Sequence, residues 1–197
     1  FVIFSIRCSF LVMIDENEFF RQATLRICGD LEIEQAMSAL LRYLSQVMPA
    51  DRMFLQRFDQ GLGAMCTIAH STKEESRKVD LLTPLSSEAR ATVERAEYTP
   101  TRDVFIFEKP EDNPISREML HFHKVTATSL MVMMLISGKH ILGSVVLITD
   151  GETGYTEEHA RLFALLKDPF VVAMSNTLQH HELMILKDML ADDNRFL

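Results

Sequence analysis

Residues 129–149 read SLMVMMLISGKHILGSVVLIT, and this stretch decides the fold. Two strongly apolar runs flank the short segment 138–140, which contains a glycine. Apolar runs of this length around a glycine-containing turn are typical of two β-strands in a hairpin. Because successive side chains of a strand point to opposite faces, Met131 and Met133 are expected on one face and their neighbours on the other. The stretch therefore predicts an antiparallel hairpin.

A second hairpin is predicted earlier in the chain. DRMFLQRFD (51–59) and AMCTIAHS (64–71) are two short β-prone runs joined by a turn with two glycines. Residues 72–122, between the hairpins, are interpreted as irregular. Within them we expect a polar run over 73–78, a short helix over 87–97, a strand over 103–107 and a loop over 108–119.

Helices are predicted at both ends of the chain. Asp15 and Glu18 have the spacing of a capping box before a helix over 15–27, and a helix with i, i+3, i+4, i+7 periodicity follows over 33–48, ended by Pro49. After the second hairpin, Thr156 is expected to cap a long helix that Pro169 bends. Antiparallel strands with helices gathered at the chain ends indicate an α+β domain over 15–178.

This order of elements predicts a layered architecture. The helices are expected to cover one face of a central antiparallel sheet, and the irregular middle of the chain is expected to form a loop-rich cap on the other face. A cavity beneath such a cap is a place where a small molecule can bind.

The element order, together with ISREMLHFHKV (115–125), ILGSVVL (141–147) and YTEEHARLF (155–163), resembles a GAF domain. The resemblance covers roughly residues 18–178 and rests on the order and spacing of weak motifs. It implies a profilin-like fold and a non-catalytic sensory role. The tail over 166–197 is similar to the segment that joins GAF sensors to the AAA+ ATPase of sigma-54-dependent transcriptional activators, which implies such an output domain and control of transcription.

The tail also has a helical pattern of its own, which we interpret as the start of a signalling helix over 179–197. Leu183, Leu186, Leu190 and Leu197 follow a 3-4 heptad rhythm, with Asp193 in place of one apolar residue. A helix with such a stripe can pair with its copy in a homodimer. The alternative is that the stripe packs on the domain's own sheet. From Leu183 onward we favour pairing, because the core should be complete by then.

Strand alternation also locates a candidate pocket. In MFLQRF (53–58), Phe54, Gln56 and Phe58 share one face, and a polar amide between two aromatic rings suits a ligand pocket. A polar position at a sheet edge explains Gln56 equally well. If the pocket exists, the expected floor and lid residues are Phe54, Gln56, Phe58, Met131 and Met133, with Phe105, Phe107 and His121 above them.

Composition limits the classes of partner. The 197 residues carry a formal charge of -8 and no block of basic residues, so direct nucleic-acid binding is not expected. Three widely spaced cysteines indicate no disulfide framework, and a reducing cytoplasm is the expected location. The apolar segment 1–14 is shorter than a membrane span and contains Arg7. We favour an over-extended reading frame for its first dozen residues, the alternative being a segment that docks on a partner.

The chemical motifs of enzymes are missing from the sequence. It contains no GxxxxGK[ST], no G-x-S-x-G and no H-E-x-x-H motif. His121 and His123 could contribute to a metal site, but we favour the interpretation that one of them is partly buried and the other is exposed. Signatures of cyclic-nucleotide and bilin-attaching GAF domains are not found, so the ligand and any cofactor stay unknown. A sensory domain is therefore expected, the rival interpretations being a ligand-free dimerisation module and a GAF-fold enzyme.

Overall fold

The computed structural model describes residues 15–98, 102–138 and 140–193. The N-terminal segment 1–14 and Leu197 therefore lie outside the described residues. Six antiparallel strands form one sheet in the order β3-β2-β1-β6-β5-β4, which confirms the predicted antiparallel sheet. The strands are β1 (Arg52–Asp59), β2 (Ala64–Thr72), β3 (Ser76–Pro84), β4 (Val104–Phe107), β5 (Ser129–Ser137) and β6 (His140–Thr149).

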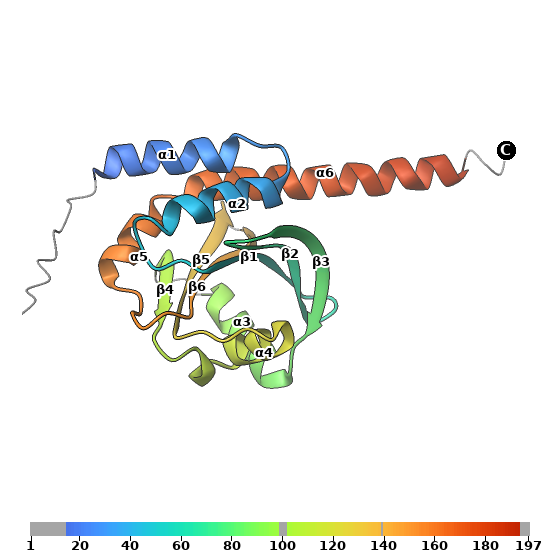
Figure 1. Ribbon diagram of the computed structural model, residues 1–197. Coiled ribbons are helices and arrows are strands. Elements are labelled where there is room, and N and C mark those ends of the chain that lie inside the picture. The colour runs from blue at the N-terminus through green and yellow to red at the C-terminus, as the bar shows by residue number, and fades with distance from the viewer. Residues whose placement is uncertain (1–14, 99–101, 139, 194–197) are drawn as a thin grey trace, which may run out of the picture.

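The helices divide between the two faces of this sheet (Figure 1). One face is covered by α1, α2 and α6, and α3 and α4 lie on the other, so the predicted layers are confirmed. A short 3-10 turn precedes α4. The bounds are α1 (Glu16–Cys28), α2 (Ile33–Leu44), α3 (Ser87–Tyr98), η1 (Pro110–Asp112), α4 (Pro114–His123), α5 (Glu157–Ala164) and α6 (Lys167–Asp193).

The main core lies between the sheet and the first group of helices. Met131 and Met133 of β5 are fully buried there, together with Phe163 of α5 and Phe170 and Met174 of α6. Each such side chain contributes about 1.5–3 kcal/mol when it leaves water. At the start of α1, the Asp15 carboxylate accepts hydrogen bonds from the amides of Asn17 and Glu18. The predicted N-cap is thus correct.

Strand β3 corrects the interpretation of the polar run that follows residue 72. Ser76–Pro84 pairs with β2 along nearly its whole length, although most of its side chains are exposed. It is one of the two outer strands of the sheet, and its Asp80 has a positive φ of 42°. A strand held mainly by backbone hydrogen bonds on one side needs no alternation of apolar residues, which is why the sequence pattern did not reveal it.

Helix α4 is a second correction, because this stretch was expected to be a loop. The Asn113 side chain accepts a hydrogen bond from the Ser116 amide, and Pro114 occupies the first turn. Both residues are favoured in those positions, since the cap satisfies a free amide and proline has none to lose. Lys124 ends the helix in a left-handed conformation. The Asn-Pro pair was a start signal that the sequence contained.

The predicted bend at Pro169 is instead a break between two helices. Helix α5 ends at Ala164, and α6 begins at Lys167, so Pro169 lies in the first turn of a new helix. There its missing amide costs no intrahelical hydrogen bond. Thr156 caps α5, and His159 completes the capping box. The break lets α6 run along the sheet and project beyond the domain (Figure 1).

Candidate functional site

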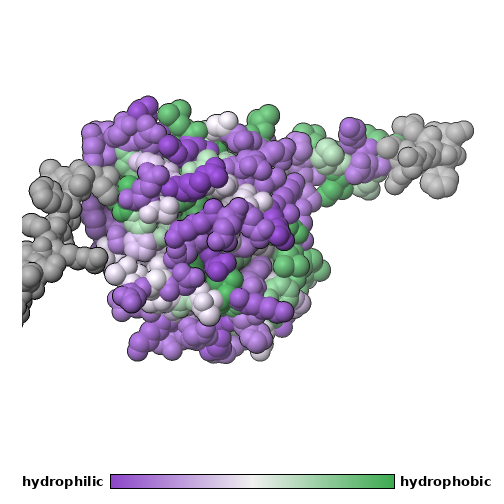
Figure 2. Space-filling view, in the orientation of Figure 1, coloured by the Kyte–Doolittle hydropathy of each residue, from purple (hydrophilic) through white to green (hydrophobic). Residues whose placement is uncertain are grey.

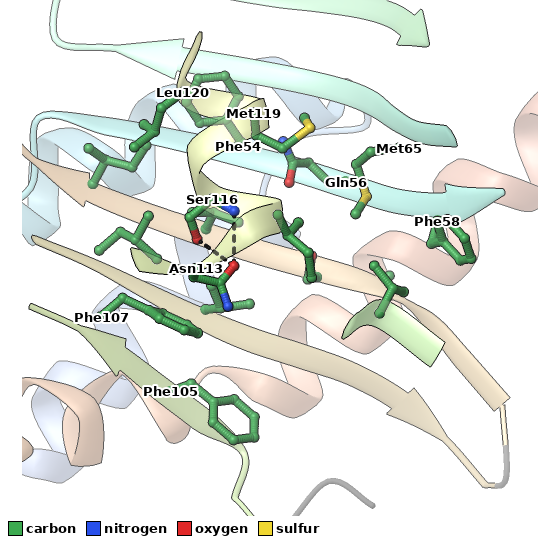
Figure 3. Close-up of a pocket in the computed structure, with 18 of the residues that line it drawn as sticks. Phe54, Gln56, Phe58, Met65, Phe105, Phe107, Asn113, Ser116, Met119 and Leu120 are labelled. Carbon is green, nitrogen blue, oxygen red and sulfur yellow. Dashed lines mark hydrogen bonds between the residues drawn. The ribbon is translucent and has the colours of Figure 1, made fainter. Parts of the chain in front are cut away.

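A cavity of about 280 Å³ lies between the sheet and the layer formed by α3 and α4. Figure 3 shows its aromatic and polar walls, with α4 above the strands. Its floor comes from β1, β5 and β6, one side comes from β4, and its roof comes from α3 and α4. Most of its lining is apolar.

Three of the predicted residues line the cavity from β1. Phe54, Gln56 and Phe58 all face it, as strand alternation predicts. Gln56 is only 5% exposed, and β1 lies between β2 and β6. The interpretation of Gln56 as a polar residue at a sheet edge is therefore wrong. Phe105 and Phe107, predicted for the lid, line the cavity from β4. Whether these residues bind a ligand stays a prediction.

The placement of Met131 and Met133 in the floor is corrected. Both are buried on the opposite face, beneath the helices, and Leu130, Val132 and Met134 take their place in the cavity. The register gives the reason, because directly paired residues share a face of the sheet. Val132 pairs with Val146, which pairs with Phe54 on the cavity side. Met133 pairs with Val145 on the helix side.

The lid histidine is His123 rather than His121. His121 is exposed on the outer side of α4, whereas His123 lines the cavity. One face of α4 supplies a row of lining residues that the sequence reasoning missed. Their spacing of i, i+3, i+4 and i+7 is that of a helix face, and this signal was available once the helix was recognised. The row is Ser116, Met119, Leu120 and His123.

A small polar network lies in one wall of the cavity. Gln56 Nε2 donates to Thr67 Oγ1 at 3.4 Å, and Thr67 Oγ1 lies 3.2 Å from His123 Nε2. Phe54 stacks on His70 with 4.5 Å between ring centroids and tilts against His123 at 5.0 Å. Burial lowers the pKa of His123, and burial followed by the nearby His123 lowers the pKa of His70. Both shifts favour the neutral form of the two rings.

These two histidines give a pH dependence of stability. We expect the free energy of unfolding to fall as the pH drops below about 6.5, where an unfolded histidine takes up its proton. The folded His70 and His123 have lowered pKa values, so they stay neutral until a lower pH, and the unfolded state binds protons first. The stability that the neutral histidines provide is complete above the pKa of an unfolded histidine. It is lost as the pH falls through the lower pKa values of the folded His70 and His123.

Urea titrations from pH 5 to 8 test this dependence. The variant His70→Gln/His123→Gln is expected to show a flatter profile than the wild type over this range. His180→Gln, at an exposed position on α6, is the control and is expected to keep the wild-type slope. An unchanged slope in the double variant would contradict the expectation.

Groups that suggest catalysis or metal binding do not converge on this cavity. Burial raises the pKa of the Cys66 thiol, the opposite of what a reactive thiolate requires. Asp103, a carboxylate at the start of the β4 segment, pairs with Lys167 at 2.5 Å. Among the described residues, no three His, Cys, Asp or Glu side chains are placed to hold a metal ion. No helix in the described part of the chain is long and apolar enough to cross a membrane.

The floor of the cavity is also the surface on which α6 packs. Gly143 of β6 lines the cavity, and a β-carbon built on it would lie 2.9 Å from Met174 Cε of α6 and 2.2 Å from the Gln56 carbonyl oxygen. At Gly143, the backbone of β6 alone separates the cavity from α6.

Beyond the body of the domain, α6 carries exposed apolar side chains. Leu183 is 65% and Leu186 is 56% exposed, and Ile185, Met189 and Leu190 are exposed as well. Figure 2 shows hydrophobic patches along this projecting segment, next to a largely hydrophilic domain surface. The stripe does not pack on the domain's own sheet, so that alternative is wrong for Leu183 and Leu186.

This architecture is the fold of GAF domains. The chain matches the phycoerythrobilin-bound GAF domain from a cyanobacterial phytochrome with a TM-score of 0.56 and 18% identity, over 86% of this chain and 100% of that one. It matches the GAF domain of an Acinetobacter phosphoenolpyruvate-protein phosphotransferase with a TM-score of 0.59 and 10% identity, over 85% and 97%. A methyl-accepting chemotaxis protein, residues 122 to 287, gives 0.57 and 11%, over 79% and 96%.

These likenesses are in structure, at identities that show the fold alone. No family model matches the chain, and no curated protein sequence matches it. The predicted α+β class and GAF-like fold are confirmed by the structure neighbours. Resemblance to sigma-54-dependent activators receives no support from them.

Proposed function

We propose that this chain is a non-catalytic sensory domain that binds a small molecule in the cavity and passes the signal through α6 to an output domain. The observation that carries the proposal is a cavity of about 280 Å³ with the buried Gln56 turned into it. A mostly apolar hollow with a few convergent polar groups is the usual form of a ligand site. Bilin-bound GAF domains among the structure neighbours support binding in this fold.

The signal would cross the sheet. A ligand that contacts Val132 and Met134 biases the conformation of β5, whose Met133 packs under the helices on the other face. A β-carbon built on Gly143, in the cavity floor, would lie 2.9 Å from Met174 Cε of α6. Ligand binding then shifts the population between two arrangements of α6.

The output that we propose is an attached AAA+ ATPase, and through it transcription from sigma-54 promoters, in the cytoplasm. The resemblance of the tail over 166–197 supports this choice. We further propose that the sensor acts as a homodimer. The exposed stripe that includes Leu183 and Leu186 supports pairing of two α6 helices.

Filling the cavity tests the sensory function. Val132→Phe is expected to reduce the occupancy of a co-purifying small molecule at least tenfold, because the larger ring takes its space. Native mass spectrometry of the fresh protein measures the bound mass. Val172→Phe, the same change at a residue of α6 that is 54% exposed, is the matched control and should keep the wild-type occupancy.

Circular dichroism and the unfolding midpoint establish that both variants are folded. A wild type without any bound mass would argue against the sensor, as would a folded Val132→Phe variant with unchanged occupancy. Loss of the bound mass in Val132→Phe alone supports it.

A further inference from the structure

We infer that the ligand is a neutral, largely aromatic or aliphatic molecule of one to three rings that carries a single hydrogen-bonding group. This inference rests on the proposed sensory function and specifies its ligand class. Three properties of the cavity support it: the charge of its lining, its size and the position of its polar groups.

The first property is the absence of charge. Among the described residues that line the cavity there is no Lys, Arg, Asp or Glu. The one titratable side chain is His123, and burial lowers its pKa, which favours the neutral ring. An anion or cation that enters would lose its hydration without a partner of opposite charge, at a cost of several kcal/mol. Phosphates, carboxylates and amines are therefore disfavoured.

The second property is size and shape. The volume of about 280 Å³ is just below the usual range of about 300–1,000 Å³ for ligand pockets. A linear tetrapyrrole is far larger and carries two carboxylates, so it fits neither the volume nor the charge of this site. Four phenylalanines, Phe54, Phe58, Phe105 and Phe107, line the hollow. Aromatic walls favour a flat ring through stacked or edge-to-face contacts.

The third property is that few polar side chains line the cavity and that two of them, Gln56 and His123, meet in one place. Asn113 Oδ1 accepts from Ser116, and Thr92 Oγ1 donates to the Glu88 carbonyl, so these two oxygens have partners within the protein. The Asn113 amino group and the Ser144 hydroxyl also belong to the lining, and Ser144 pairs with Gln56 across β6 and β1. Gln56 and His123 meet at the Thr67 hydroxyl. The structure gives the Gln56 side chain one hydrogen bond, donated by Nε2, which leaves the carbonyl oxygen Oε1 to accept from a ligand. One polar group on an otherwise apolar ligand matches this wall.

A pair of fluorescent probes with the same ring skeleton tests the charge preference. N-phenyl-1-naphthylamine is neutral, and 1-anilinonaphthalene-8-sulfonate adds one negative charge to it. Titration of the wild type with each probe, after removal of any bound molecule, is expected to give at least tenfold tighter binding of the neutral probe. The titrations are run at about 0.5 M salt, where the protein's net charge of -8 is screened.

Val132→Phe localises the binding, and Val172→Phe serves as its control. Neutral-probe binding that Val132→Phe abolishes and Val172→Phe preserves supports the inference. If the sulfonate binds as tightly as the neutral probe, and Val132→Phe abolishes that binding, the neutral class is overturned while the sensory function stands. If neither probe shows binding that depends on Val132, both the inference and the proposed function are overturned.

Discussion

Gly143→Ala is expected to lower the free energy of unfolding by about 3 kcal/mol, the upper part of the range for overpacked positions. A β-carbon at this position would lie 2.2 Å from the carbonyl oxygen and 3.3 Å from the carbonyl carbon of Gln56. Both are backbone atoms of the central strand β1, so no rotamer change relieves the contact. Met174 Cε, at 2.9 Å, can move aside, but the carbonyl cannot.

Chemical denaturation at pH 7 measures this change. Gly151→Ala is the matched control, because its new β-carbon would meet only Thr149 Oγ1 at an ordinary 3.5 Å. The control is expected to stay within about 0.5 kcal/mol of the wild type. A loss below about 1 kcal/mol for Gly143→Ala would mean that β6 can move away from β1 at little cost. Gly143 would then not connect the cavity floor rigidly to α6.

Leu183→Glu/Leu186→Glu is expected to raise the dissociation constant of the proposed dimer at least a hundredfold. In a paired helix, both side chains of both copies would leave water, four leucines in all, each worth about 1.5–3 kcal/mol. Replacing them with glutamates also places like charges along the seam. Both leucines are well exposed in the single chain, so its own fold loses little.

Sedimentation equilibrium of wild type and variants measures the association. Leu62→Glu/Leu82→Glu adds the same two charges at other exposed leucines, in the β1–β2 turn and on β3, and should leave the dimer intact. A monomeric wild type at about 100 μM would contradict the proposed pairing. A dimer that survives Leu183→Glu/Leu186→Glu would mean that the interface lies elsewhere on the domain.

Local pattern was sufficient for most of the elements. The hairpin over 129–149, the hairpin over 51–71 and the two N-terminal helices were all predicted, because a one-sided buried strand or helix shows its period in the sequence. The exposed edge strand β3 has no such period, and α4 was missed although Asn113 and Pro114 signal its start. Both misses fell within residues 72–122, the part of the chain that was interpreted as irregular.

For the site, alternation in the sequence determined that Phe54, Gln56 and Phe58 share one face, and likewise Met131 and Met133. It did not determine whether these two sets share the same face, because that depends on which residues pair across β1, β6 and β5. The tertiary register placed Val132 opposite Val146 and Val146 opposite Phe54, and so turned the two methionines toward the helices. A shift of one residue would have reversed the result.

The sequence by itself determined the layered α+β class, the positions of most strands along the chain and the apolar stripe of the tail, since these depend on near neighbours in the chain. Only the tertiary structure decided which histidine enters the cavity, that Gln56 is buried in a central strand, and that one sheet separates the cavity from α6. These properties arise from contacts between residues far apart in the sequence. The energies of these contacts depend on strand pairing and side-chain packing, which cannot be derived from a local sequence pattern.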